Sequence, residues 1–260
     1  MSAVLKPKNS KPVRERVSRE EWQMRAELAA AYQLAAIFKW TDLIYTHFSA
    51  RVPGSEDFLI NPYGLMFDEI SAANLVRIDE HGKVLDDPLK LGYNEAGFVI
   101  HGCVHAARPE INCVIHTHTR AGVAVSAMKC GLLPISQHAM RVQRQVTYHD
   151  YEGIALDMGE RARMAKDLGG KSKAMILRNH GLLTLGESVR EAFELMYYLD
   201  CACQIQIDAM AGGMDNVLQM SRQAGDTAAA QFERPDRPSS HKDWPALLRL
   251  LDRKGSNYAS

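Results

Sequence analysis

Hydrophobic residues recur along the chain in two alternating patterns, one with the 3.6-residue period of a helix and one with the short runs of strands. Residues 20–40 are rich in alanine and leucine at helical spacing, which predicts a long helix that begins at Ser18. Two β-like runs follow at 46–52 and 57–62, with a Pro-Gly-Ser-Glu-Asp turn between them.

The two patterns continue to alternate as far as residue 212. Further helices are predicted at 70–74, 94–108, 119–131, 159–170 and 188–210. Further strands are predicted at 76–79, 111–118 and 145–156, and as a pair within 173–186. Ser188 and Glu191 have the spacing of a capping box at the start of the last long helix. The mixed pattern, without an internal repeat or linker, predicts one α/β domain.

The two ends of the chain are more polar than its middle. Residues 1–17 are rich in Lys, Arg, Pro and Ser and predict a flexible N-terminal tail, so the domain is expected to span 18–215. Residues 216–260 predict a C-terminal extension that ends in a short amphipathic segment at 244–255. We expect this extension to be available for packing on a neighbouring subunit.

Composition narrows the class of protein. The chain has 260 residues, of which 46% are hydrophobic and 24% charged, with a formal net charge of zero. These values are ordinary for a globular protein and provide no bulk charge to attract nucleic acid or a membrane surface, so neither partner is expected. The sequence shows neither a leader-type apolar segment nor a run of membrane-spanning length, and its five cysteines are odd in number. We therefore expect a reducing, cytoplasmic setting.

The candidate chemistry lies in the stretch VIHTHT at residues 114–119. Side chains alternate between the two faces of a strand, so His116 and His118 would project from one face and Thr117 from the other. Two imidazoles placed in this way can give two nitrogens to one metal ion, although a His-x-His pair also arises in strands by chance.

Two further residues could complete such a site. His180 follows an apolar strand in a tight turn before glycine, where α/β proteins often place their chemistry, but a turn histidine bonded to backbone is the simpler interpretation. Glu95 begins a predicted helix, where an acid also complements the helix dipole without any further role. Three imidazoles and one carboxylate suit Zn²⁺, with Mn²⁺ or Fe²⁺ as alternatives. Spacing alone indicates a metal enzyme and leaves the reaction open.

Several strings, taken together, resemble the class II aldolase/adducin family. They are FLINPYGLMFDEI at 58–70, the run at 94–136, YHDYEGIAL at 148–156 and ILRNHGLLTLGESVREAF at 176–193. They occur in the family's order, and the resemblance covers roughly residues 20–215. The segments HTHTRAGVAVSAMKCGLLPIS and ILRNHGLLTLGE are particularly similar in sequence to the head domain of adducin, the cytoskeletal branch of the family.

The resemblance implies a fold and an assembly. The fold is a three-layer α/β/α sandwich around a central, mostly antiparallel sheet, as in the family's enzymes, which are similar to fuculose-phosphate aldolase and ribulose-phosphate epimerase. Those enzymes form homotetramers with their sites at subunit boundaries and act on small-molecule substrates.

The resemblance also implies which residues form the site. His116, His118 and His180 would bind the metal, with Glu95 as a ligand at rest and as acid/base once substrate is bound. Adducin heads lack the acid at this position, so Glu95 favours an enzyme over a scaffold. His138 matches, by offset, a tyrosine that donates a proton in the neighbouring subunit's site, and an imidazole can donate a proton near neutral pH. The alternative for His138 is an ordinary surface-loop histidine.

The sequence departs from the sugar-phosphate aldolases where those enzymes bind phosphate. Thr46 and His47 stand in place of Gly-Asn, Tyr63 in place of a small hydroxyl residue, and Tyr93–Asn94 in place of paired serines. Phosphate sites need small residues for close backbone approach and short donors. We therefore expect a substrate without phosphate, such as a flatter or carboxylated molecule.

Other polar residues have simpler interpretations. His101 and His105 are four residues apart on a predicted helix but match no site residue of the family, so they are expected to be surface or packing histidines. Cys201 and Cys203 diverge on a helix and are expected to be buried thiols. Tyr151 either lines the site or packs on a strand.

The sequence thus predicts a zinc-dependent lyase that cleaves a C–C bond, by aldol cleavage or decarboxylation. The reaction would pass through a metal-stabilised enolate of a small, non-phosphorylated hydroxy-carbonyl or hydroxy-acid substrate. One alternative is an adducin-like, non-catalytic scaffold that binds the actin cytoskeleton. Another is a sugar-phosphate aldolase or epimerase, which would need the phosphate site that this sequence lacks.

Overall fold

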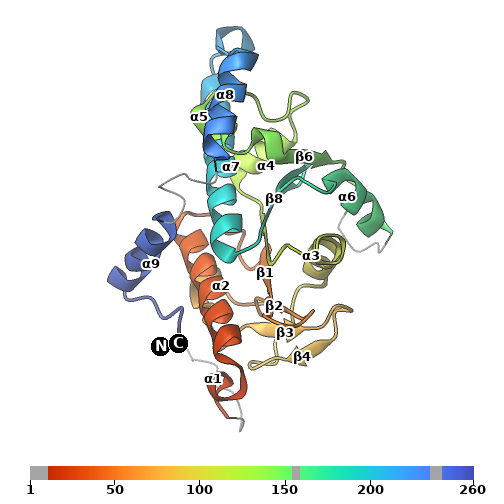
Figure 1. Cartoon of the computed structure of the whole chain (residues 1–260), viewed down its shortest axis with the longest axis vertical. Coiled ribbons are helices and arrows are strands. Elements are labelled where there is room, and N and C mark those ends of the chain that lie inside the picture. The colour runs from red at the N-terminus through yellow and green to blue at the C-terminus, as the bar shows by residue number, and fades with distance from the viewer. Residues whose placement is uncertain (1–10, 154–158, 235–241) are drawn as a thin grey trace.

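A computed structural model describes residues 11–153, 159–234 and 242–260 as an eight-stranded sheet with helices on both faces (Figure 1). The strands are β1 (His47–Arg51), β2 (Phe58–Ile60), β3 (Val76–Ile78), β4 (Val84–Asp86), β5 (Cys113–Thr117), β6 (Val146–His149), β7 (Ala174–Leu177) and β8 (Gly181–Gly186). The α-helices are α1 (Val13–Arg16), α2 (Arg19–Ile37), α3 (Glu95–Ala107), α4 (Arg120–Ser126), α5 (Gln137–Met140), α6 (Glu160–Leu168), α7 (Val189–Met210), α8 (Arg222–Phe232) and α9 (Asp243–Arg253).

The strand order confirms the predicted sandwich with a mostly antiparallel sheet. The order is β4-β3-β2-β1-β5-β8-β7-β6, and β6 and β7 form the one parallel pair among these neighbours. In the centre, His47 of β1 lies opposite His116 of β5, and Thr117 of β5 lies opposite Leu182 of β8. This register brings the start of β1, the end of β5 and the start of β8 together, at one end of the central strands.

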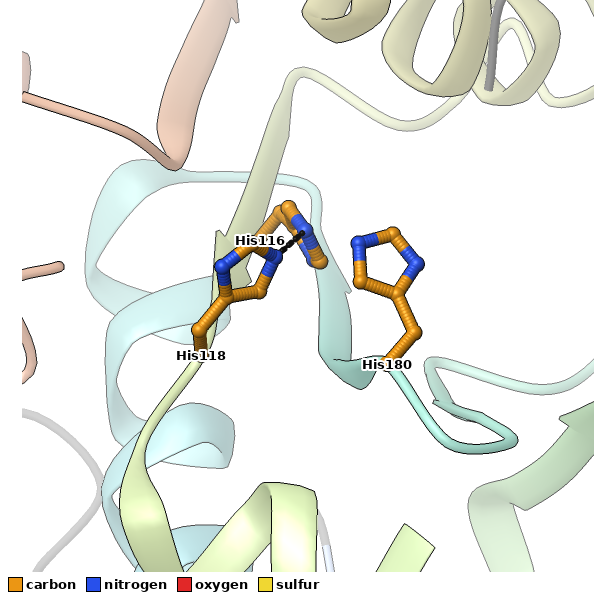
Figure 2. A group of neighbouring side chains, drawn as sticks. All are labelled: His116, His118 and His180. Carbon is orange, nitrogen blue, oxygen red and sulfur yellow. Dashed lines mark hydrogen bonds between the residues drawn. The ribbon is translucent and has the colours of Figure 1, made fainter. Parts of the chain in front are cut away.

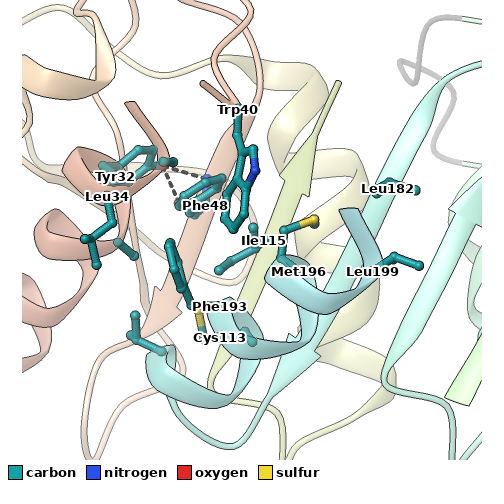
Figure 3. Close-up of a cluster of buried hydrophobic side chains, with 14 of the residues drawn as sticks. Tyr32, Leu34, Trp40, Phe48, Cys113, Ile115, Leu182, Phe193, Met196 and Leu199 are labelled. Carbon is teal, nitrogen blue, oxygen red and sulfur yellow. Dashed lines mark hydrogen bonds between the residues drawn. The ribbon is translucent and has the colours of Figure 1, made fainter. Parts of the chain in front are cut away.

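Residues of β5 alternate between two hydrophobic cores on opposite faces of the sheet. Ile115 packs in the larger core with α2 and α7 (Figure 3), whereas Val114 packs in a second core with α3 and α6. The Thr117 hydroxyl donates to Met196 Sδ of α7 at 3.2 Å. His116, one residue earlier, therefore lies on the opposite, α3-covered face, as the strand pattern predicted.

The starts of the two long helices match their predicted caps in different degrees. Ser18 Oγ accepts the Glu21 N–H at 3.1 Å and begins α2, as expected. Ser188 Oγ accepts the Glu191 N–H at 3.2 Å and begins α7. The Glu191 carboxylate, however, accepts the N–H of Glu187 at 2.8 Å and not that of Ser188. The serine half of the predicted capping box is therefore formed, and the glutamate half is not.

The structure differs from the predicted elements at three places. Residues 70–74 form a turn instead of a helix, because the Asn74 side chain accepts the Ser71 N–H and competes with helical bonding. The expected N-terminal tail contains helix α1, which buries Val13. The polar stretch after residue 213 contains helix α8, held to α5 through packing of the two helices.

Helix α9 shows that the C-terminal extension packs at least partly on its own chain. Trp244 and Leu251 are buried in the larger core, and the Gln33 side chain of α2 bonds those of Ser256 and Asn257. Contact of the extension with a neighbouring subunit stays a prediction. The parts of the predicted segments that lie outside the described residues are 1–10, 154–156 and 235–241.

The cysteines and the apolarity of the helices bear on the expected setting of the chain. All five cysteines are free thiols in this structure, with Cys203 buried and Cys201 half-buried on α7. Within the described residues, none of the helices combines the length and the apolarity needed to cross a bilayer.

Tyr32 joins α2 to the middle of the sheet. Its buried hydroxyl accepts the Phe48 N–H at 2.6 Å and donates to Asn61 Oδ1 at 2.8 Å, and its ring stacks on Phe48 with centroids 4.6 Å apart (Figure 3). Burial raises the pKa of Tyr32 well above its ordinary value, so the hydroxyl stays a neutral donor. Because Phe48 adjoins His47, this contact also fixes the strand end that carries that histidine.

We predict that Tyr32→Phe lowers the free energy of unfolding by about 1–3 kcal/mol, because the buried Phe48 N–H and Asn61 side chain lose their partner. Urea unfolding followed by circular dichroism measures this change. Tyr151→Phe is the control, since that side chain is exposed, and it should change the free energy by less than about 0.5 kcal/mol. Equal effects of the two substitutions would contradict the prediction.

Candidate metal centre and its cavity

Three histidines from neighbouring strand ends converge on one point (Figure 2). His116 lies in β5, His118 follows the end of that strand, and His180 stands in the turn between β7 and β8. One nitrogen from each ring lies within 4.8 Å of the others, and the Nε2 atoms of His116 and His118 are 2.9 Å apart. The fold therefore brings together the three histidines that the sequence singled out.

The outer nitrogens of two rings are held by acceptors. His116 Nδ1 donates to the Leu182 carbonyl oxygen at 3.0 Å, and His118 Nδ1 donates to Asp42 Oδ2 at 2.9 Å. Because these oxygens only accept, each Nδ1 carries a proton, and a ring that is neutral then presents a lone pair at Nε2. Two lone pairs 2.9 Å apart repel each other unless a cation, either a proton or a metal ion, lies between them.

Burial disfavours a proton as that cation. Burial lowers the pKa of His116 well below its ordinary value, and the neighbouring histidines lower it further. Burial, followed by the effect of His118, lowers the pKa of His180 to about 4. Neutral imidazole is the form that binds a divalent metal, so the donor set fits the metal ion that the sequence implied.

The turn that carries His180 depends on two backbone positions. Asn179 has a φ of 55°, in the left-handed region that asparagine tolerates better than most residues. A Cβ at Gly181 would lie 2.4 Å from the Thr117 carbonyl oxygen, so glycine is needed for the turn to approach β5 this closely. Together these residues place His180 beside His116.

The three ring nitrogens face a cavity of about 380 Å³. Tyr45, Thr46, Tyr63 and Tyr151 form much of its wall, and the rings of Tyr45 and Tyr63 lie 6.4 Å apart. No lysine or arginine of the described residues lines this cavity. Phosphate sites usually draw on such cations, so the lining agrees with the expected lack of a phosphate cradle.

The departures from the sugar-phosphate aldolases occupy two different places. Thr46, His47, Tyr63 and Asn94 line the cavity. Tyr93 does not, because its hydroxyl donates to the Gly82 carbonyl at 2.7 Å and holds the ring against the turn between β3 and β4. Of the two bulky tyrosines expected in the cavity, Tyr63 therefore lines it and Tyr93 does not.

Thr46 combines two unfavourable features at the cavity wall. Its φ is 67°, which β-branched residues rarely adopt, and its buried Oγ1 has no hydrogen-bond partner within the described part of the chain. Strain and an unpaired hydroxyl each cost on the order of 1–3 kcal/mol. Such features persist mainly at functional sites, which supports a ligand-binding role for this wall of the cavity.

The two predicted acid/base residues lie outside the group of three histidines. Glu95 is the exposed first residue of α3, and its carboxylate is not a ligand in this conformation, although Asn94 and Ala96 on either side line the cavity. His138 lies in α5 with its ring 6.0 Å from that of Tyr198, and it is not among the residues lining the cavity of its own chain. Both catalytic roles stay predictions.

Sequence reasoning missed the polar residues that support the site. Asp42 orients His118 from 76 positions away, and no local pattern connects the two. His101 and His105 were expected to be surface or packing residues, and the packing alternative is confirmed, since both are buried against β1; their hydrogen bonds to His47 and Ser49 were not predicted. A histidine pair at helical spacing beside a polar strand was the available signal.

The fold and the site together define a class of protein: an α/β sandwich with an antiparallel centre and, at its strand ends, three histidines that could hold a metal ion. The chain belongs to the class II aldolase and adducin family, since residues 26–207 match the family model for the Class II Aldolase and Adducin N-terminal domain. This confirms the resemblance drawn from the sequence.

Individual relatives represent both branches of the family. A Pseudomonas aeruginosa protein provisionally named a class 2 aldolase is 47% identical over 250 residues, which cover 95% of each chain. Alpha-adducin of Rattus norvegicus is 44% identical over 245 residues, which cover 89% of this chain and 33% of that protein. The crystal structure of an aldolase II superfamily protein from Pseudomonas syringae is 52% identical, with a TM-score of 0.92 over 96% of this chain and 100% of that one.

We predict that Asp42→Ala weakens Zn²⁺ binding by about tenfold to a hundredfold, because His118 loses the carboxylate that orients its ring. Competition with a chromophoric chelator measures the affinity. Asp215→Ala removes an exposed carboxylate at a distance from the site and should leave the affinity unchanged. Identical affinities of the two variants would show that Asp42 does not support the site.

We also predict that Gly181→Ala weakens Zn²⁺ binding by at least about tenfold, since the added Cβ pushes the turn of His180 away from β5. Gly170→Ala is the matched control, because a Cβ there would meet no atom within 4 Å. Circular dichroism should show both variants folded. Wild-type affinity in folded Gly181→Ala would contradict the role assigned to the turn.

Proposed function

We propose that this chain is a metal-dependent lyase that cleaves a C–C bond in a small, non-phosphorylated hydroxy-carbonyl or hydroxy-acid compound. The observation that carries the proposal is the convergence of three imidazoles on a cavity that no described lysine or arginine lines. Membership of the class II aldolase and adducin family supports lyase chemistry of the aldolase type.

The donor set suits a particular group of metals. His116, His118 and His180 would hold the ion, which we propose to be Zn²⁺, with Mn²⁺ or Fe²⁺ as alternatives, because imidazole nitrogens favour these ions. When bound, the ion would supply positive charge against the negative charge that develops on a substrate oxygen as the C–C bond breaks.

The chain's own residues would move the protons. Glu95 stands next to cavity residues Asn94 and Ala96, so rotation of its side chain can bring the carboxylate to the substrate. There it would accept the proton of a substrate hydroxyl as the C–O bond becomes a carbonyl and the C–C bond breaks. In aldol cleavage this proton then returns to the carbon that keeps the electron pair, and an aldehyde leaves. In decarboxylation the substrate carboxylate loses CO₂ without giving up a hydroxyl proton, and Glu95 in its protonated form would supply the proton to that carbon.

The assembly implied by the family would add a second proton donor. We propose a homotetramer in which His138 reaches the site of the neighbouring subunit. This arrangement is supported by the position of His138 on α5, away from the cavity of its own chain. An imidazole is a suitable proton donor near neutral pH.

An adducin-like scaffold is the second candidate function. It is favoured by the 44% identity with alpha-adducin, of which this chain spans about a third. A scaffold would need neither a bound metal nor the converging lone pairs of His116 and His118. Metal binding therefore separates the two candidates.

We predict that Zn²⁺- or Mn²⁺-loaded protein, screened on hydroxy acids and aldols, releases an aldehyde or CO₂. A chelator should remove the activity and added metal should restore it. His116→Ala and His118→Ala should each lower turnover by at least about a hundredfold, because each removes a metal ligand. His81→Ala, at an exposed histidine on the turn between β3 and β4, is the control and should keep wild-type turnover.

Two results would speak against the lyase proposal. Absence of a stoichiometric divalent ion from the purified protein would overturn the lyase proposal. Wild-type cellular activity of His116→Ala and Glu95→Ala variants, with the oligomer preserved, would favour the scaffold.

A further inference from the structure

A chain of buried hydrogen bonds leads from the cavity into the interface between β1 and α3. Its links are His47 Nδ1 to His101 Nε2 at 2.9 Å, His101 Nδ1 to Ser49 Oγ at 2.6 Å, Ser49 Oγ to His105 Nε2 at 2.9 Å, and His105 Nδ1 to the Ile111 carbonyl oxygen at 3.2 Å. The four side chains are each at most 3% exposed. Strand and helix therefore share one continuous polar seam.

Close packing holds these rings in place. A Cβ at Gly97 of α3 would lie 2.8 Å from the His47 ring, so glycine is what allows the helix to cover this histidine. At the other end, the His105 ring stacks on Phe58 with centroids 4.3 Å apart. Neither ring can turn over without displacing its neighbours.

The three rings of the chain are neutral. His47 is buried and bonds no carboxylate of the described residues, and burial lowers the pKa of His101 well below its ordinary range, with the adjacent histidines lowering it further. Burial, and then the positive charge of Arg51, lower the pKa of His105 to about 3. A neutral imidazole has one N–H donor and one lone-pair acceptor.

The direction of every bond follows from the carbonyl at the end of the chain. Since the Ile111 oxygen only accepts, His105 Nδ1 donates, and its Nε2 accepts the hydroxyl proton of Ser49. The Ser49 oxygen must then accept from His101 Nδ1, which leaves His101 Nε2 as the acceptor for His47 Nδ1. His47 Nε2 is therefore left with a lone pair.

The residue that carries the free nitrogen lines the cavity. His47 lines the cavity, and its ring centroid lies 5.1 Å from that of His116. Its Nε2 is not part of the group of three converging nitrogens. The hydrogen bond of its ring within the described residues uses Nδ1, which leaves Nε2 for a bound molecule.

We propose that His47 Nε2 accepts a hydrogen bond from a hydroxyl group of the substrate, and that the site thereby selects a hydroxyl over a carboxylate or phosphate at this position. The inference rests on the proposed function, because it assumes that the substrate occupies this cavity. His47 is thus a specificity residue, while Ser49, His101 and His105 are positioning residues that fix its tautomer.

The physical basis of the selection is that like lone pairs repel. A carboxylate or phosphate oxygen carries no proton at neutral pH and would face the lone pair of His47, whereas a hydroxyl donates to it. Reversing the tautomer of His47 would reverse every bond of the chain. The lone pair of His105 Nδ1 would then face the Ile111 carbonyl oxygen, which opposes the reversal.

The tautomers can be measured directly. The full chain, prepared without metal and with ¹⁵N-labelled histidine rings, should give solid-state spectra in which His47, His101 and His105 are neutral and protonated at Nδ1. The His47→Phe variant assigns the His47 signals by their loss. A proton on His47 Nε2 would overturn the proposal.

Selectivity is tested with two hydroxy acids that differ in one group. Glycerate ends in a hydroxyl where tartronate ends in a second carboxylate, and calorimetry on the Zn²⁺-loaded full chain gives the dissociation constant of each. Ser49→Ala should lower the ratio of the tartronate constant to the glycerate constant by about tenfold, the value of one hydrogen bond. The reason is that His101 and His47, cut off from the carbonyl, can take the reverse tautomers.

Two further variants make this measurement decisive. Ser126→Ala removes another buried serine, whose hydroxyl bonds the Val123 carbonyl in α4, and should keep the wild-type ratio. His47→Phe keeps a planar ring without the acceptor and should lower the ratio even if Ser49→Ala fails to fold. A wild-type ratio in folded His47→Phe would overturn the proposal.

The proposed lyase function and the proposed role of His47 can fail separately. If His116→Ala keeps turnover, the proposed lyase function fails, while the tautomers of the buried chain remain as observed. If His116→Ala loses turnover but His47 carries its proton on Nε2, the lyase function stands and only the role of His47 fails.

Discussion

A buried neutral imidazole can donate from one nitrogen only, and this constraint organises the region around the cavity. His116 and His47 are buried and each bonds a protein acceptor through Nδ1, which leaves Nε2 of the neutral ring as a lone pair, and the half-buried His118 bonds Asp42 through Nδ1. The fixed points are oxygens that cannot donate: the carbonyls of Leu182 and Ile111 and the carboxylate of Asp42. The sheet and its loops thus set the donor and acceptor character of the cavity wall through hydrogen bonds.

The fold gathers these histidines because the ends of three central strands, β1, β5 and β8, lie side by side. The register of β1 against β5 sets His47 opposite His116, and the pairing of β5 with β8 brings the His180 turn alongside. Helix α3 closes the same region from above the sheet and supplies the buried histidines of the seam. Tyr32 ties α2 to β1 on the opposite face, so both layers of helices hold the strand that carries His47. The candidate site therefore depends on all three layers of the sandwich.

The relatives of this chain carry the names of both class 2 aldolases and adducins, so the fold alone does not decide the activity. The decision lies in particular side chains. We propose lyase chemistry on the basis of the three converging histidines and Glu95, and we propose a ligand without phosphate because no described lysine or arginine lines the cavity. The strained backbone and unpaired hydroxyl of Thr46 agree with a wall shaped for binding, since such features lower stability and need another reason to persist.

The sequence by itself determined most of the helices and strands of the domain, the shared face of His116 and His118, and the family, because periodicity, strand alternation and ordered motifs are local properties of the chain. Only the tertiary structure decided which distant groups meet. It paired His118 with Asp42, joined His101 and His105 to Ser49, turned Tyr93 away from the cavity and left Glu95 exposed at the start of α3. These outcomes depend on strand register and on the packing of α3 against the sheet, and hydrogen-bond partners separated by 50 or more residues leave no local pattern by which they could be predicted.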